Sequence, residues 1–246
     1  MSNSNLVLIG TLHDDGYGPV RLEKLLQSLA PQLIALEWHK ERDKVFAEYV
    51  ETQERLKSRL LELLDKKGFN KIQQERFSYI FSQIVRTSGY EGQVAKDYVS
   101  KNPEVELEYI DDPIIASQSA RMMDGNAFSF WLEIIQNRQN KAKLRKMLNT
   151  KGSYADMTDS KEMDQSYLAI RNGLIDPIMV NPKTVLAAQV MVRDPYMERE
   201  IRRMYGDGSK KLVSPVGTGH LYGLRKRLSD LDPTVMTLLD ADKIAA

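Results

Sequence analysis

Two short apolar runs, each followed by a glycine turn and a histidine, constrain the fold of this chain more than any other feature. Residues 6–9 lead into Gly10-Thr11-Leu12-His13, and residues 212–216 lead into Gly217-Thr218-Gly219-His220. A continuous apolar run of this length is typical of a strand buried on both faces of a parallel sheet. Because open α/β folds place their sites at the carboxyl ends of such strands, the pattern predicts that His13 and His220 lie at one sheet edge.

Taken alone, either motif has a plainer explanation. Glycine after a strand is ordinary turn chemistry, and a single histidine in a protein is usually structural. The repetition after two matching runs favours a shared site, since the chain has just three histidines. Two imidazoles at one edge are typical of a metal site or of an acid/base pair.

The rest of the apolar pattern predicts an α/β fold with a central, mostly parallel sheet and flanking helices. Residues 33–36 form another buried run, and a helix-spaced segment, from Val20 to Leu29, separates it from the first strand. This arrangement is a βαβ unit, for which a right-handed crossover is expected. Further strands are expected at residues 106–110 and 234–239.

Helical spacing dominates between these strands. A long amphipathic helix is expected from about residue 41 to 67, followed by helices at residues 73–86 and through Val94 and Tyr98. Residues 114 to about 206 are predicted to form a large helical insertion in a single domain that spans residues 1–246. Within it, Asp194-Pro195 is interpreted as the N-cap and first residue of a new helix.

Composition narrows the function classes. The net charge is +1, from 35 basic and 34 acidic residues, which argues against a nucleic-acid partner. Cysteine is absent, so any metal must be held by His, Asp, Glu, carbonyl oxygen or water. The sequence shows neither a signal-peptide pattern nor an apolar stretch of about 18 residues, and a cytoplasmic location is expected.

Three residues directly follow expected parallel strands: His13, Glu37 and His220. Two histidines and one carboxylate are a recurrent ligand set for divalent zinc, manganese, cobalt or iron. A helix-capping role for the Glu37 carboxylate is the plainer alternative.

Four other residues are weaker candidates. Glu91 follows a glycine turn at a helix start, where an acid also complements the helix dipole. Arg193 could equally be a solvated arginine, and Asp111 ends a strand, where it could orient a ligand or cap the next segment. His39 faces the same side as Glu37 only if that strand continues.

Six short motifs occur in a recognisable order. They are Gly10-Thr11-Leu12-His13; Pro31-Gln32-Leu33-Ile34-Ala35-Leu36-Glu37 with Arg42 just beyond; Gly89-Tyr90-Glu91; Tyr109-Ile110-Asp111; Arg193-Asp194-x-Tyr196-Met197; and Val216-Gly217-Thr218-Gly219-His220-Leu221-Tyr222-Gly223-Leu224. In this order they resemble the TraB/PrgY/TIKI family. The resemblance implies a fold shared with erythromycin-esterase-like and ChaN-like proteins, and it covers about residues 6 to 228.

The resemblance also implies an activity, because TIKI members are described as metal-dependent proteases and PrgY-like members act against peptide pheromones. It places His13, Glu37, Glu91 and His220 at the site, with Arg42 and Arg193 nearby as substrate-binding residues. We therefore predict a hydrolase of peptides or proteins that uses Mn, Co or Zn.

In this prediction His13, Glu37 and His220 hold the ion. Glu91 or Glu37 acts as general base, and Arg193 stabilises an oxyanion or a substrate carboxylate. The alternatives are a non-catalytic peptide-binding protein of the same fold and a metal-free esterase. A homodimer is also compatible with the helical insertion.

Overall fold

The core of the molecule is a five-stranded parallel sheet. A computed structural model describes residues 4–244 apart from 14, 40, 41, 88, 113, 115–130, 151, 154–164, 166 and 168–184. Every neighbouring pair of strands in the sheet is parallel. The spatial order is β3 (Glu106–Tyr109), β2 (Leu33–Leu36), β4 (Leu212–Gly217), β1 (Leu6–Thr11) and β5 (Thr234–Thr237). The α/β fold predicted from the apolar runs is confirmed.

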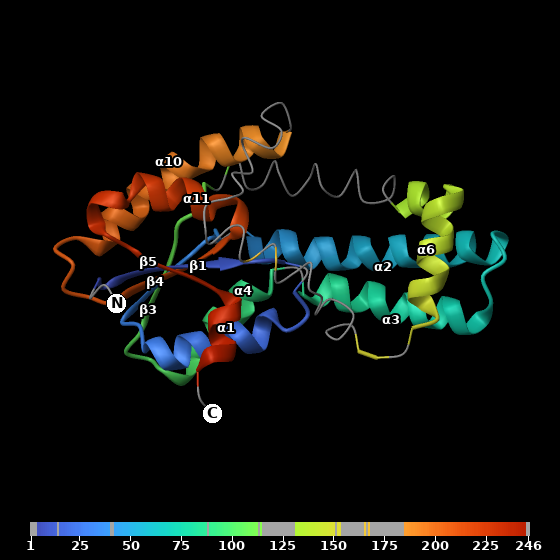
Figure 1. The fold of residues 1–246 in the computed structure, drawn as a ribbon, viewed down its shortest axis with the longest axis horizontal. Helices are drawn as coiled ribbons and strands as arrows, with labels where there is room; N and C mark the ends of the chain where they lie inside the picture. Colours follow the sequence, from blue (N-terminus) through green and yellow to red (C-terminus); the bar gives the residue numbers. More distant parts are fainter. Residues whose placement is uncertain are drawn as a thin grey trace.

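The central strands are buried on both faces, which explains why they are largely apolar. In β1, Val7 and Ile9 pack into one core, while Leu6 and Leu8 pack into a second core on the opposite face. The first core is covered by α1 (Gly18–Leu29), α4 (Tyr90–Lys101) and the short 3-10 helix η2 (Leu238–Lys243). The second is covered by α10 (Val185–Tyr205) and α11 (Thr218–Arg227), which lie on the other side of the sheet in Figure 1. A further 3-10 turn, η1 (Ser229–Leu231), precedes β5.

A third hydrophobic core lies beyond the sheet. It joins α2 (Arg42–Lys66), α3 (Lys71–Thr87) and α6 (Arg138–Leu148), which extend to one side of the sheet in Figure 1. Phe77, Phe81 and Trp131 form its aromatic centre, with ring centroids 5.3–5.9 Å apart. The helices expected at residues 41–67 and 73–86 are therefore present, and their apolar faces pack on one another.

The predicted helical insertion at about 114–206 lies in large part outside the described residues. Its described parts include the helices α6 and α10, as a helical insertion predicts. Among the helices of the described ranges, none is both long and apolar enough to cross a membrane. The single domain and the homodimer stay predictions.

The expected helix start at Asp194-Pro195 is wrong. Helix α10 runs unbroken from Val185 to Tyr205, with Pro195 inside it. A proline there removes one helical hydrogen bond and costs about 3 kcal/mol. Tertiary packing outweighs this cost: Met197 and Ile201, on the following turns, are buried against the sheet. Asp194 is likewise buried and bonds to His220 instead of capping a helix.

Candidate functional site

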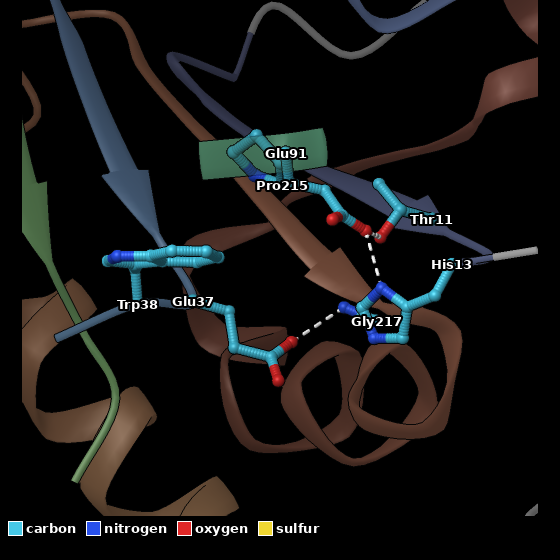
Figure 2. Close-up of a pocket in the computed structure, with 7 residues that line it drawn as sticks. All are labelled: Thr11, His13, Glu37, Trp38, Glu91, Pro215 and Gly217. Atoms are coloured by element: carbon cyan, nitrogen blue, oxygen red, sulfur yellow. Dashed lines mark hydrogen bonds and ion pairs between the residues drawn. The ribbon is translucent and has the colours of Figure 1, made fainter. Parts of the chain in front are cut away.

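The carboxyl ends of three adjacent strands meet in one pocket. Thr11 ends β1 and His13 follows two residues later; Glu37 comes directly after β2; Gly217 ends β4 and leads into α11. Because β4 lies between β1 and β2, these ends are side by side. The pocket shown in Figure 2 is lined by Thr11, His13, Glu37, Trp38, Glu91, Pro215 and Gly217.

Glu37 is hydrogen-bonded through both of its carboxylate oxygens. Its Oε2 accepts a hydrogen bond from the backbone N–H of Gly217 at 2.6 Å, at the N-terminus of α11, where the helix dipole favours an anion. Its Oε1 accepts one from Arg193 at 2.6 Å and lies 3.5 Å from Nε2 of His220. Burial alone would raise the pKa of this carboxyl, but positive charge on His220, Arg193 and His13, with the Gly217 bond, holds the pKa well below its usual range.

The two histidines are held in the same way by different elements. Nδ1 of His13 lies 2.9 Å from Oε1 of Glu91, in the first turn of α4. Nδ1 of His220 lies 2.6 Å from Oδ1 of Asp194, in α10. Since a carboxylate is an acceptor, each Nδ1 carries the proton; Nε2 of His13 then lies near Gly217 and Nε2 of His220 near Glu37. The side chain of His13 is 55% exposed, whereas that of His220 is 6% exposed.

Glu91 is fixed by a second bond, because Thr11 Oγ1 donates to its Oε1 at 2.7 Å. Burial would raise the pKa of Glu91, but the interaction with His13 and the Thr11 hydroxyl outweigh burial and lower it. In Figure 2 both dashed lines from Glu91 start at the same oxygen, and the other oxygen lies on the side of Trp38. The carboxylate is therefore ionised and turned towards the pocket.

Arg193 bridges two acids. It donates to Asp111 through Nε at 2.8 Å and through a terminal nitrogen at 2.6 Å, and that same nitrogen reaches Glu37. The guanidinium is thus committed to protein carboxylates, whereas the sequence prediction gives it to an oxyanion or to substrate. Asp111 lies two residues after the end of β3 and orients Arg193.

Arg42 and His39 are the remaining candidates from the sequence. Arg42 is the first residue of α2, and its side chain lies outside the described part. His39 is buried, but it is not among the residues that line the pocket. Strand β2 ends at Leu36, so the alternation that would pair His39 with Glu37 does not extend that far.

Donor atoms of Glu37 and His13 and a carbon of the His220 ring lie around Gly217. A Cβ atom added to this glycine would lie 3.3 Å from Glu37 Oε2, 3.7 Å from His13 Nε2 and 4.0 Å from His220 Cδ2. His220 is not among the residues that line the pocket, and its Nε2 lies 3.5 Å from Glu37 Oε1. Two imidazoles and a carboxylate around one glycine suit zinc, manganese or cobalt. In the described residues, no three His, Cys, Asp or Glu side chains already stand as a metal ligand set. Each oxygen of Glu37 has a hydrogen-bond partner, so an ion would use a remaining lone pair of Glu37 or replace one of these partners.

The charge around this space also suits a cation. The acids Glu37, Glu91, Asp111 and Asp194 are buried or nearly so. Arg193 bonds to Glu37 and Asp111, whereas Glu91 and Asp194 are paired with the two histidines. Buried charges are stable when paired or when they coordinate metals. The site therefore fits a divalent ion by both donor chemistry and charge.

Sequence reasoning missed three residues of the site. The sequence places Thr11 in a turn, Asp194 at a helix cap and Gly223 within a motif, and it predicts no site role for any of them. A Cβ atom at Gly223 would lie 1.8 Å from Asp194 Oδ2, so the glycine makes room for this carboxylate. The spacing of His220 and Gly223, three residues apart and so on one helix face, is the pattern that could have found it.

Comparisons with family models, with curated proteins and with solved structures give no match for this chain. The resemblance to the TraB/PrgY/TIKI family therefore stays a prediction.

Proposed function

We propose that this protein is a metal-dependent hydrolase whose ion is held by His13, Glu37 and His220. The observation that carries the proposal is the convergence of these side chains beside Gly217, with both histidines bonded through Nδ1 to buried carboxylates. Metal-binding histidines almost always have such a partner, which orients the ring and makes the other nitrogen a stronger ligand. The peptide or protein substrate and the cytoplasmic location stay predictions from the sequence.

An ion held by these residues would supply Lewis acidity for a carbonyl group and for water near neutral pH. The protein's own groups do the rest. Glu91 holds His13 through Oε1, and its other oxygen is the proposed acceptor for the proton of the attacking water. Arg193 keeps Glu37 ionised and fixed, so we assign it a positioning role rather than contact with substrate.

The test is hydrolysis of a peptide library by protein purified without a histidine tag. We expect cleavage that stops after chelation and returns when Zn²⁺, Mn²⁺ or Co²⁺ is added. Tight binding of an ion without any turnover would contradict the enzyme and favour the peptide-binding alternative.

One observation favours a second candidate, a metal-free esterase. Both oxygens of Glu37 already have partners, and the His13–Glu91 pair, whose atoms Nδ1 and Oε1 lie 2.9 Å apart, can act as an acid/base couple. Ester hydrolysis that survives chelation and is lost in His13→Ala would select this candidate.

A further inference from the structure

Two consecutive residues of α10 act on the same histidine. Asp194 accepts from Nδ1 of His220 at 2.6 Å, and Arg193 binds Glu37 Oε1, which lies 3.5 Å from Nε2 of the same ring. The ring therefore lies between two carboxylates, both of which attract its proton.

The distances decide where the proton of a neutral ring stays. The bond to Asp194 is short and buried, and charge-assisted bonds of this kind are the strong ones. Glu37 is farther away, and its charge is shared with Arg193 and with the Gly217 N–H. The Nδ1–H tautomer is thus favoured, which leaves the lone pair of Nε2 towards Glu37.

We propose that Asp194 is a positioning residue for His220, and that Gly223 in α11 leaves the space that the Asp194 carboxylate needs in order to reach the ring. Asp194 keeps the ring proton on Nδ1, so that Nε2 is ready to bind an ion. This inference rests on the proposed function for its purpose, but the tautomer itself does not require a metal.

Local geometry supports a dedicated arrangement. With any side chain at position 223, the Asp194 carboxylate could not keep its place, because a Cβ atom there would lie 1.8 Å from Oδ2. Pro195 follows within the same helix at a cost in backbone hydrogen bonding. Local sequence rules are broken mostly at functional sites, and here two such positions, 195 and 223, flank one carboxylate.

The direct experiment is a long-range ¹H–¹⁵N spectrum of the histidine rings in metal-free protein at one fixed pH. The chain has three histidines, and His220→Ala identifies the signals of His220. We expect Nδ1 of His220 to be protonated in the wild type. In Asp194→Ala the proton should move to Nε2, next to Glu37, and in Gly223→Ala it should move likewise because the carboxylate is pushed out.

Two further variants separate positioning from general damage. Asp194→Asn keeps an oxygen that can accept from Nδ1 and should preserve the tautomer, whereas Lys226→Ala, on the exposed side of α11, should change nothing. Zn²⁺ affinity should fall about 10- to 100-fold in Asp194→Ala and in Gly223→Ala. The double variant should be no worse than the weaker-binding single one, since both changes break one interaction.

The outcomes are distinct. Protonation of Nε2 in the wild type, or an unchanged His220 spectrum in Asp194→Ala, would overturn the positioning role. Additive losses of Zn²⁺ affinity in the double variant would overturn the claim that Gly223 acts by making room for Asp194. If the tautomer behaves as expected while the wild type binds no Zn²⁺, the positioning role stands and the proposed metal-dependent function fails.

Discussion

The two Gly-Thr-x-His motifs are nearly the same in sequence and differ in how the protein supports them. His13 lies in a loop after β1, with a side chain that is 55% exposed, and it is held by Glu91 of α4. His220 lies in the first turn of α11, with a side chain that is 6% exposed, and it is held by Asp194 of α10. A strand-turn-histidine pattern thus places an imidazole at the sheet edge, but the packing around it decides how rigid that imidazole is.

The loop of His13 has its own anchors. Asp15 is bonded to Arg21 of α1 and to the hydroxyl of Tyr167, and Arg21 continues to Asp242 near the C-terminus. The hydroxyl of Tyr90 donates to the carbonyl of Leu12 at 3.3 Å. Side-chain hydrogen bonds therefore hold the His13 loop in place, whereas the helical backbone of α11 holds His220.

The largest expected effect is that of His220→Ala. The variant leaves Asp194 buried without its partner, and breaking a buried pair costs about 3–5 kcal/mol. From the sequence, with His220 in a turn, the expected loss is at most about 1–2 kcal/mol. Urea unfolding of metal-free protein decides between the two, and a loss below about 1 kcal/mol would mean that burial of the pair is unimportant.

His13→Ala should separate function from stability. Its ring is half exposed, and Glu91 keeps its bond to Thr11, so a loss of about 1 kcal/mol is expected. Zn²⁺ binding and hydrolysis should nevertheless fall at least about 100-fold, as for His220→Ala, because a ligand matters more than its outer partners. Equal destabilisation by the two histidine variants would refute the contrast between loop and helix.

Glu91→Gln tests the support of His13 without a change of size. Turnover should fall about 10²-fold or more, since the proton acceptor is lost. Zn²⁺ affinity should fall by about 10-fold, since His13 loses an ionised partner. Steady-state kinetics at saturating Zn²⁺ separates the two effects, and full turnover there would remove Glu91 from the chemistry.

Tyr167→Phe is expected to have the smallest effect. It removes the hydroxyl that donates to Asp15 Oδ2 at 3.0 Å, which should cost about 1–2 kcal/mol. Because Asp15 and Leu12 flank His13, the ring signals of His13 should shift while those of His220 stay in place. Shifts of the same size in both rings would show that the two supports are not independent.

The sequence predicted the strands better than the supports. Residues 6–9, 33–36 and 212–216 are apolar because both faces of their strands are covered, and this local property places His13, Glu37 and His220 at strand ends. The position of β4 between β1 and β2 depends on packing of segments far apart in the chain, so it could not be derived from periodicity.

Asp194 shows why the residues that support the two histidines could not all be predicted from the sequence. Asp-Pro is equally typical of a helix start. The feature that overrides this interpretation is Gly223, which lies in another helix and 29 residues away in sequence. For Glu91 the two interpretations from the sequence, an acid at a helix start and a site residue, hold together, because it lies in the first turn of α4 and also bonds to His13.

The central claim is that two differently supported histidines bind one ion. Isothermal titration of tag-free, metal-free protein with Zn²⁺ tests it most directly, in the wild type and in His13→Ala and His220→Ala. We predict one ion per chain in the wild type and a comparable loss of affinity in both variants. Unchanged Zn²⁺ binding in either variant would contradict the claim, because the two motifs would then not share a site.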